Sequence, residues 1–137
     1  MQLVQKFSAT PKGMVAQINR TLRTGLVLNL RAVGIEAFCA EDSLTILSKA
    51  IQMPTDLLLI DFRLADSNGP QVIKFIRAAE RGDRHMPIIA VGVLRPGERE
   101  QFEKAGADSV IDLNELDADI LSTVEKFLTR ANRTCAC

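Results

Sequence analysis

The sequence lacks several features that would assign it to a specialised class of protein. Its 17 basic and 17 acidic residues cancel, so no excess positive charge indicates a nucleic-acid partner. It has only three cysteines, an odd number that does not favour a disulfide framework. Apolar runs such as Leu57–Ile60 are far shorter than the roughly 20 residues of a membrane-spanning helix. The first seven residues lack the basic start and apolar stretch of a signal peptide. We therefore expect a cytoplasmic protein that contacts neither nucleic acid nor membrane.

What the sequence does contain is a regular alternation of short apolar stretches with amphipathic ones. The predicted strands are 14–18, 35–39, 56–61, 86–93 and 109–111. The predicted helices are 20–33, 42–51, 70–79, 96–105 and 116–130. This alternation is typical of an α/β fold with a doubly wound sheet. Right-handed crossovers favour the flavodoxin-like arrangement, a five-stranded parallel sheet in the order 2-1-3-4-5 with five helices.

Glycines and apolar periodicity refine the predicted helices. Gly34 and Gly106 follow the first and fourth helices, where a glycine can adopt the left-handed conformation of a helix cap. Helical spacing predicts that Leu44 and Ile51 of the second helix, and Phe75 of the third, point toward the core. The chain is expected to divide into an N-terminal extension (1–12), one domain (13–131) and a C-terminal tail (132–137) that frays.

In this fold, ligands bind beyond the carboxyl ends of the strands, where the strand order reverses. Asp61 ends the apolar stretch 57–60 and therefore presents a carboxylate at that edge of the sheet. His85 precedes a strand at the opposite end and is expected to be an ordinary surface residue. Cys135 and Cys137 form a Cys-Ala-Cys tail without the second pair of ligands that a zinc site needs.

Three segments resemble the receiver domains of two-component signalling proteins. The stretch LLLIDFRLADSNG (57–69) is similar to the phosphoacceptor strand and loop, with Gly69 eight residues after Asp61. The stretches MPIIAV (86–91) and KAGAD (104–108) resemble the fourth strand and the turn before the fifth. The similarity covers about residues 13–130, and it implies the receiver fold with Asp61 at the phosphoacceptor position.

The resemblance also implies partners for Asp61 that this sequence does not supply. Receivers hold Mg²⁺ with an acidic pair at the end of the first strand, and the matching positions here are Gln17 and Ile18. The receiver hydroxyl residue after the fourth strand falls on Gly92, and the aromatic residue of the fifth strand falls on Val110. The lysine–proline pair after the fifth strand falls on Leu113 and Asn114. Moving the alignment by one residue brings in Asn19 or Asp112 but does not restore the acidic pair and the lysine. The sequence therefore indicates a degenerate receiver, or pseudo-receiver.

We expect a protein–protein interaction module that acts independently of phosphorylation and has no enzymatic activity or cofactor. The partner would be a histidine kinase or another signalling protein. Leu94 and Leu116 are candidate docking residues beside the face formed by 96–105, 109–111 and 116–130, which could also form a homodimer.

Two alternatives stay open. In the first, a histidine kinase phosphorylates Asp61 with the help of Mg²⁺, and the protein is a functional response regulator. In the second, Gln17, Asn19, Gly92 and Asn114 bind a small molecule in the vacated pocket.

Overall fold

The computed structural model describes residues 10–53 and 55–136, with side chains as far as residue 128. Its five strands are β1 (Lys12–Ala16), β2 (Glu36–Ala40), β3 (Leu57–Ile60), β4 (Ile88–Gly92) and β5 (Ser109–Asp112). They form one sheet in the order β2-β1-β3-β4-β5, and every pair is parallel. The predicted fold class and strand order are confirmed.

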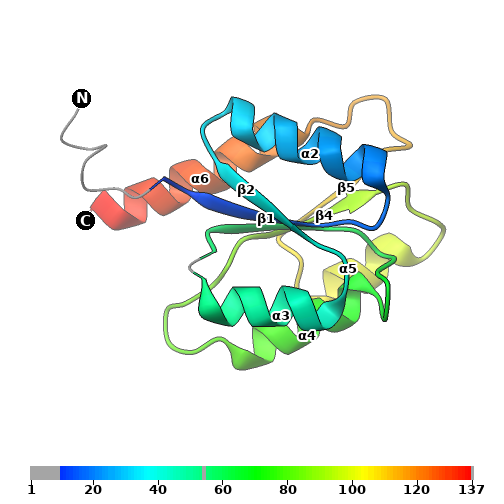
Figure 1. Ribbon diagram of the computed structural model, residues 1–137, viewed down its shortest axis with the longest axis horizontal. Helices are drawn as coiled ribbons and strands as arrows, with labels where there is room; N and C mark the ends of the chain where they lie inside the picture. The colour runs from blue at the N-terminus through cyan, green and yellow to red at the C-terminus, as the bar shows by residue number, and fades with distance from the viewer. Residues whose placement is uncertain (1–9, 54, 137) are drawn as a thin grey trace.

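Helices cover both faces of this sheet (Figure 1). They are α2 (Arg20–Ala32), α3 (Ser43–Gln52), α4 (Gly69–Ala79), α5 (Glu98–Ala105) and α6 (Ile120–Ala136). α3, α4 and α5 pack on one face around Phe102, and α2 and α6 pack on the other around Leu30 and Val124. All residues of β3 and β4 are buried, which explains why these two strands are continuously apolar.

Side-chain caps set the beginnings of the helices. Asn19, Asp42 and Asn68 each accept a hydrogen bond from a backbone N–H three residues ahead, at the starts of α2, α3 and α4. Asp119 caps α6 in the same way through Ser122. At the other end of α5, Gly106 has a φ of +109°, so its predicted role as a left-handed cap is confirmed.

Several predicted boundaries are wrong at the carboxyl end of the chain. The last helix begins at Ile120 rather than Leu116, because the cap lies at Asp119. It continues to Ala136, six residues beyond the predicted end. Pro96 precedes α5 instead of opening it, since Gly97 occupies the cap position. Residues 1–9 of the predicted N-terminal extension, and Cys137, lie outside the described residues, and β1 begins already at Lys12.

The predicted inward direction of three apolar residues is also wrong. The exposed fractions of Leu44, Ile51 and Phe75 are 73%, 84% and 66%. Each helical residue turns about 100° from the one before it, and all three lie on the flank or far side of the buried residues Ile46 and Ile73. Two exposed faces with large apolar side chains are therefore present on α3 and α4.

Candidate functional site at the carboxyl ends of the strands

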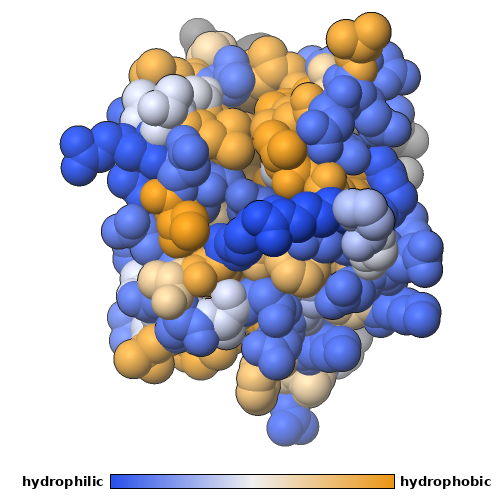
Figure 2. Space-filling view, turned by 90° about the vertical axis from the view of Figure 1, so that its right-hand side faces the viewer, coloured by the Kyte–Doolittle hydropathy of each residue, from blue (hydrophilic) through white to orange (hydrophobic). Residues whose placement is uncertain are grey.

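Four strand ends bring the predicted site residues to one edge of the sheet. Gln17 directly follows β1, and Asp61 directly follows β3. Gly92 is the last residue of β4, and Asp112 is the last residue of β5. Since all strands are parallel, these positions share the end toward which the strands run, which is the end that Figure 2 shows.

The Asp61 carboxylate is buried and uses both of its oxygens within the chain. Its side-chain Oδ2 accepts a hydrogen bond from Nε2 of Gln17 at 2.8 Å, and Oδ1 accepts one from the backbone N–H of Phe62 at 2.6 Å. Its own N–H donates to the carbonyl of Ala16 at 3.0 Å. The residue is 9% exposed. Both oxygens thus have protein donors and little access to solvent.

Gln17 is fixed in place by a set of hydrogen bonds of its own. It is 1% exposed, and its side-chain Oε1 accepts from the backbone N–H of Asn19 at 2.9 Å. Its carbonyl accepts from Arg23 at 3.1 Å, and its N–H donates to Ala40 at 3.3 Å. The amide therefore bridges Asp61 and the start of α2. A carboxylate at the same position could accept from Asn19 but could not donate to Asp61.

Gly92 allows the Asp61 carboxylate to lie against β4. A β-carbon added at Gly92 would overlap with the Asp61 side chain. The other positions implied by the resemblance are filled by apolar packing. Val110 is half-buried against the α3–α5 side of the core, and Leu113 packs against the α2–α6 side. The space that the hydroxyl side chain of a receiver would take at position 92 is therefore occupied by the Asp61 carboxylate.

An ion pair crosses the site between the loop after β3 and the start of α5. Arg63 donates to both carboxylate oxygens of Glu98, at 2.8 and 3.3 Å, and also to the carbonyl of Val93 at 3.3 Å. The hydrogen bond to Glu98 raises the pKa of Arg63, whereas desolvation lowers it. The negative charges of Glu98 and Asp61 also raise this pKa. Burial by itself would raise the pKa of Glu98, but hydrogen bonds from Arg63 and the Arg95 N–H lower it overall.

A second set of contacts, formed by Asp112 and Asn114, joins the loops after β4 and β5. Asp112 Oδ1 accepts from the backbone N–H of Leu94 at 3.3 Å and of Asn114 at 3.0 Å. The side-chain amide of Asn114 donates to Asp112 at 2.9 Å and to the Leu94 carbonyl at 3.1 Å. The pKa of Asp112 is lowered, chiefly by the hydrogen bond from the Asn114 N–H. These contacts occupy the amide that the small-molecule alternative would need.

The residues around Asp61 do not fit a magnesium site. Mg²⁺ is bound by oxygen ligands in near-octahedral geometry, usually with one or two carboxylates. Here the Asp61 oxygens are engaged, Gln17 turns an amide N–H₂ toward them, and Ile18 has no donor atom. Among the side chains that the structure describes, no three of Asp, Glu, His or Cys are grouped so that they could hold a metal ion.

The two candidate docking residues differ in accessibility. Leu94 is 8% exposed and belongs to the core, so its expected role in docking is not available in this conformation. Leu116 is fully exposed, and Ile18 and Val93 are 42% and 56% exposed. Figure 2 shows hydrophobic surface at this end beside a band of hydrophilic side chains. An apolar rim thus adjoins the Asp61 site.

The sequence analysis predicts that Gln17, Asp61 and Gly92 lie together, but it does not predict the Arg63–Glu98 ion pair or the hydrogen bonds between Asp112 and Asn114. The signal for the Arg63–Glu98 pair is absent from local spacing, because the two residues are 35 positions apart. Asp66, in the loop after β3, has a carboxylate that accepts from the N–H and hydroxyl of Ser43, which lowers its pKa. It ties the loop after β3 to α3 instead of joining Asp61.

Comparisons with known proteins confirm the resemblance to receiver domains. The chain is 27% identical over 100 residues to the polar-differentiation response regulator DivK of Brucella suis, covering 72% of this chain and 80% of the relative. A two-component response regulator from Clostridium difficile superposes with a TM-score of 0.77 at 19% identity, covering 89% and 98% of the two chains. The receiver domain of a sensor histidine kinase from Pseudomonas aeruginosa, with magnesium coordinated in its active site cleft, gives 0.73 at 25% identity, covering 89% and 97%. No family model matches the chain.

Proposed function

We propose that this chain, a receiver-domain signalling protein by its fold and its relatives, is an interaction module that works without phosphorylation of Asp61. The observation that carries this proposal is the state of the Asp61 carboxylate, whose oxygens accept from Phe62 and Gln17. The proposed activity is binding of another signalling protein, such as a kinase, in the cytoplasm, with no catalysis by this chain.

Charge supports the proposal. A phosphoryl donor carries negative charge, and its approach to an ionised carboxylate is unfavourable unless cations compensate. The guanidinium of Arg63 is close enough to Asp61 that the charge of Asp61 helps to raise the pKa of Arg63. It is also bound to both oxygens of Glu98, so the pair adds no net positive charge to the site.

The surrounding loops support it as well. A phosphorylation switch needs an element that takes two arrangements and responds to the phosphoryl group. Here Arg63 and Glu98 join the loop after β3 to the start of α5, and Asp112 and Asn114 join the loops after β4 and β5. Gly92 offers no hydroxyl, and Val110 offers no ring that could move inward. These features favour a surface with one fixed arrangement.

A functional response regulator is the second candidate. The names of the curated relatives favour it, because each is called a response regulator. Phosphorylation would then require Asp61 to leave Gln17 and Phe62 and turn away from Gly92.

Reaction with a small phosphoryl donor separates the two candidates. The full chain is incubated with acetyl phosphate and Mg²⁺, beside the Asp61→Asn variant and a receiver domain with an intact acidic pair as positive control. We expect the intact mass of this chain to stay unchanged while that of the control increases by one phosphoryl group. An increase that disappears in Asp61→Asn would overturn the proposal and establish a response regulator.

A further inference from the structure

An apolar groove lies between α3 and α4, at the opposite end of the molecule from Asp61. The two helices are side by side in Figure 1. The groove has a volume of about 540 Å³. Its apolar lining comes mainly from the last turns of the two helices and includes Leu47, Ala50, Ile51, Phe75, Ile76 and Ala79. Ile51 and Phe75, the largest exposed apolar residues on these helices besides Leu44, therefore face a concave surface.

The rim of the groove carries positive charge without a partner. Arg81 and Arg84 line it and are exposed, and neither side chain has an ion pair or hydrogen bond within the part of the chain that the structure describes. The acidic residues of the rim are engaged elsewhere. Asp56 accepts from the backbone N–H of Lys12 at 2.8 Å, and Glu80 pairs with Arg77 at 2.9 Å. The unpaired charges that line the groove are therefore those of Arg81 and Arg84, and Asp83 of the same loop is not part of the lining.

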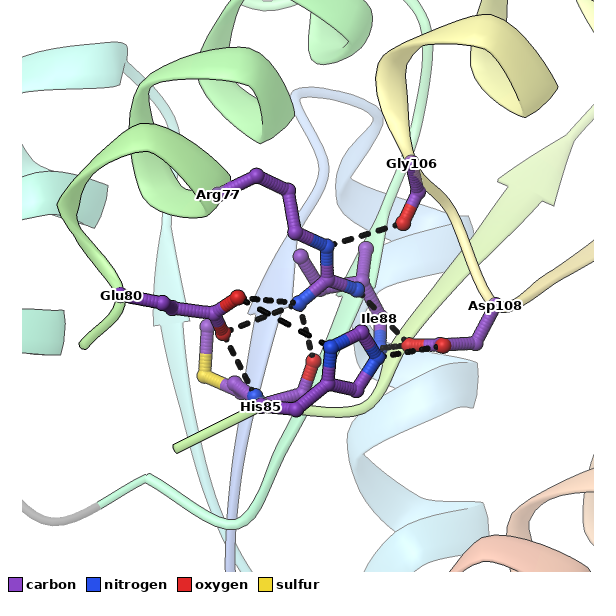
Figure 3. A network of polar contacts seen from close by, with 7 residues as sticks. Arg77, Glu80, His85, Ile88, Gly106 and Asp108 are labelled. Atoms are coloured by element: carbon purple, nitrogen blue, oxygen red, sulfur yellow. Dashed lines mark hydrogen bonds and ion pairs between the residues drawn. The ribbon is translucent and has the colours of Figure 1, made fainter. Parts of the chain in front are cut away.

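A polar network holds this rim in place (Figure 3). The guanidinium of Arg77 lies at its centre and donates to Glu80, to Asp108, and to the carbonyls of Met86 and Gly106. The Glu80 carboxylate also accepts from the backbone N–H of Met86 at 2.7 Å. These bonds tie the segment 80–88 to α4 and to the start of β5.

His85 adds to the same network. Its Nε2 lies 2.7 Å from Asp108 and its Nδ1 lies 3.8 Å from Glu80. Asp108 further accepts from the N–H of Ile88 at 2.8 Å. The loop that carries Arg81 and Arg84 is thus anchored at both ends, and a ligand would meet a preformed rim.

We propose that this groove binds an amphipathic helix of a partner protein, with apolar side chains that enter between α3 and α4 and acidic residues that pair with Arg81 and Arg84. Apolar anchors spaced by three or four residues are the means by which a helix occupies a groove between two helices. The inference rests on the proposed role as an interaction module, but not on the state of Asp61.

The observations favour a helix over the other occupants. A membrane binds apolar side chains that project from a convex surface, whereas Ile51 and Phe75 line a hollow one. A second copy placed groove to groove would leave the hollow unfilled and would bring four arginines into one interface. An acidic amphipathic helix supplies both the shape and the charge that the groove lacks.

Designed peptides test the proposal on the full-length chain. One helical peptide carries leucines at positions i, i+3, i+4 and i+7 with flanking glutamates; a second has lysines in place of the glutamates; a third is a scrambled acidic sequence. Binding is followed by amide NMR shifts and fluorescence anisotropy. We expect saturable binding of the acidic helix, with shifts centred on Ile51, Phe75 and Arg81, and binding of the other two weaker by about tenfold.

Matched variants locate the binding site. The double variant Arg81→Glu/Arg84→Glu should weaken the acidic peptide by about tenfold and improve the lysine peptide. Ile51→Asn should also weaken binding by about fivefold. The controls are Lys74→Glu, an exposed cation of α4 outside the groove, and Leu44→Asn, which lies two turns before Ile51 on the same helix. Both should retain the wild-type affinity.

The results that would overturn the proposal are specific. No saturable shifts up to about 1 mM peptide would refute helix binding. Equal losses in control and groove variants, or binding only to vesicles of anionic phospholipid, would assign the surface a different role. Equal binding by wild type and Asp61→Asn is expected. If the peptide binds but Asp61 accepts phosphate, the proposed function fails and this inference survives.

Discussion

The two ends of the sheet differ in how charged side chains beside them are paired. At the carboxyl ends of the strands, Asp61, Arg63 and Glu98 are bound to groups of the same chain, and Leu94 closes the core. At the other end, the α3–α4 groove leaves Phe75 exposed beside Arg81 and Arg84, whose side chains have no ion pair or hydrogen bond among the described residues. The three charged groups at the end where receivers place their chemistry are thus paired within the chain, whereas Arg81 and Arg84 at the opposite end leave their charges available for the proposed partner.

Placing a charge on an apolar residue at each end should give the largest difference between the two ends. Leu94→Asp should destabilise the fold by about 4 kcal/mol, because it puts a carboxylate into the core. Phe75→Asp should change stability by less than about 1 kcal/mol, since that side chain is 66% exposed. Urea unfolding of the two variants measures the contrast. Similar losses in both would show that the groove residues serve folding.

The next largest effect should come from the network below the groove. Arg77→Ala removes the partner of Glu80 and Asp108, whose side chains are only 16% and 20% exposed, and should destabilise the protein by about 3 kcal/mol. Arg99→Ala removes an ion pair with Glu115 in which the side chains are 41% and 55% exposed. It should have an effect below about 1 kcal/mol. Thermal denaturation distinguishes them, and equal effects would show that the network does not hold the rim.

A smaller effect should come from filling the space beside Asp61. Gly92→Ala puts a methyl group where the Asp61 carboxylate lies, and we expect a loss of about 2 kcal/mol. Combining it with Asp61→Ala should recover most of that loss, because the clash disappears with the carboxylate. A double-mutant cycle by chemical denaturation measures this coupling. Purely additive losses would contradict the position assigned to Asp61.

The smallest effect should be on the dependence of stability on pH. The folded-state pKa of Glu98 lies below its unfolded value, so its contribution is present above the unfolded pKa and is lost as the pH falls through the folded pKa. Below about pH 4.5, Glu98→Gln should therefore lose stability less steeply than the wild type. Denaturation midpoints across the acid range provide the comparison. Parallel curves would mean that Arg63 does not stabilise the Glu98 carboxylate.

The fold could be predicted because its signals are local. Strands such as β3 and β4 are short, apolar and buried on both faces, and helix caps such as Asp42 stand at fixed positions before their helices. The α6 boundary was missed because Leu116 continues the apolar periodicity, while the cap that fixes the start is Asp119. Phe75 was placed inward because it is apolar, although it lies about 200° around the helix from the buried Ile73.

The site could be predicted only in part. Strand ends place Gln17, Asp61 and Gly92 together once the order of the strands is known. Their hydrogen bonds depend on side-chain directions that spacing does not specify. The same is true of Arg63 with Glu98, which are brought together by packing of α5 on the sheet. The groove was not foreseen, because it arises where the ends of α3 and α4 meet the segment 80–87.

The most direct test of the account is whether the Asp61 carboxylate is available to ligands. Amide NMR spectra of the wild type and Asp61→Asn are recorded as millimolar Mg²⁺ and then beryllofluoride are added. We predict that the backbone signals of Phe62 and Gly92, and the side-chain amide of Gln17, do not move. Saturable shifts of these signals that are absent in Asp61→Asn would contradict the account, because the carboxylate would then exchange its internal partners for a metal and a phosphoryl mimic.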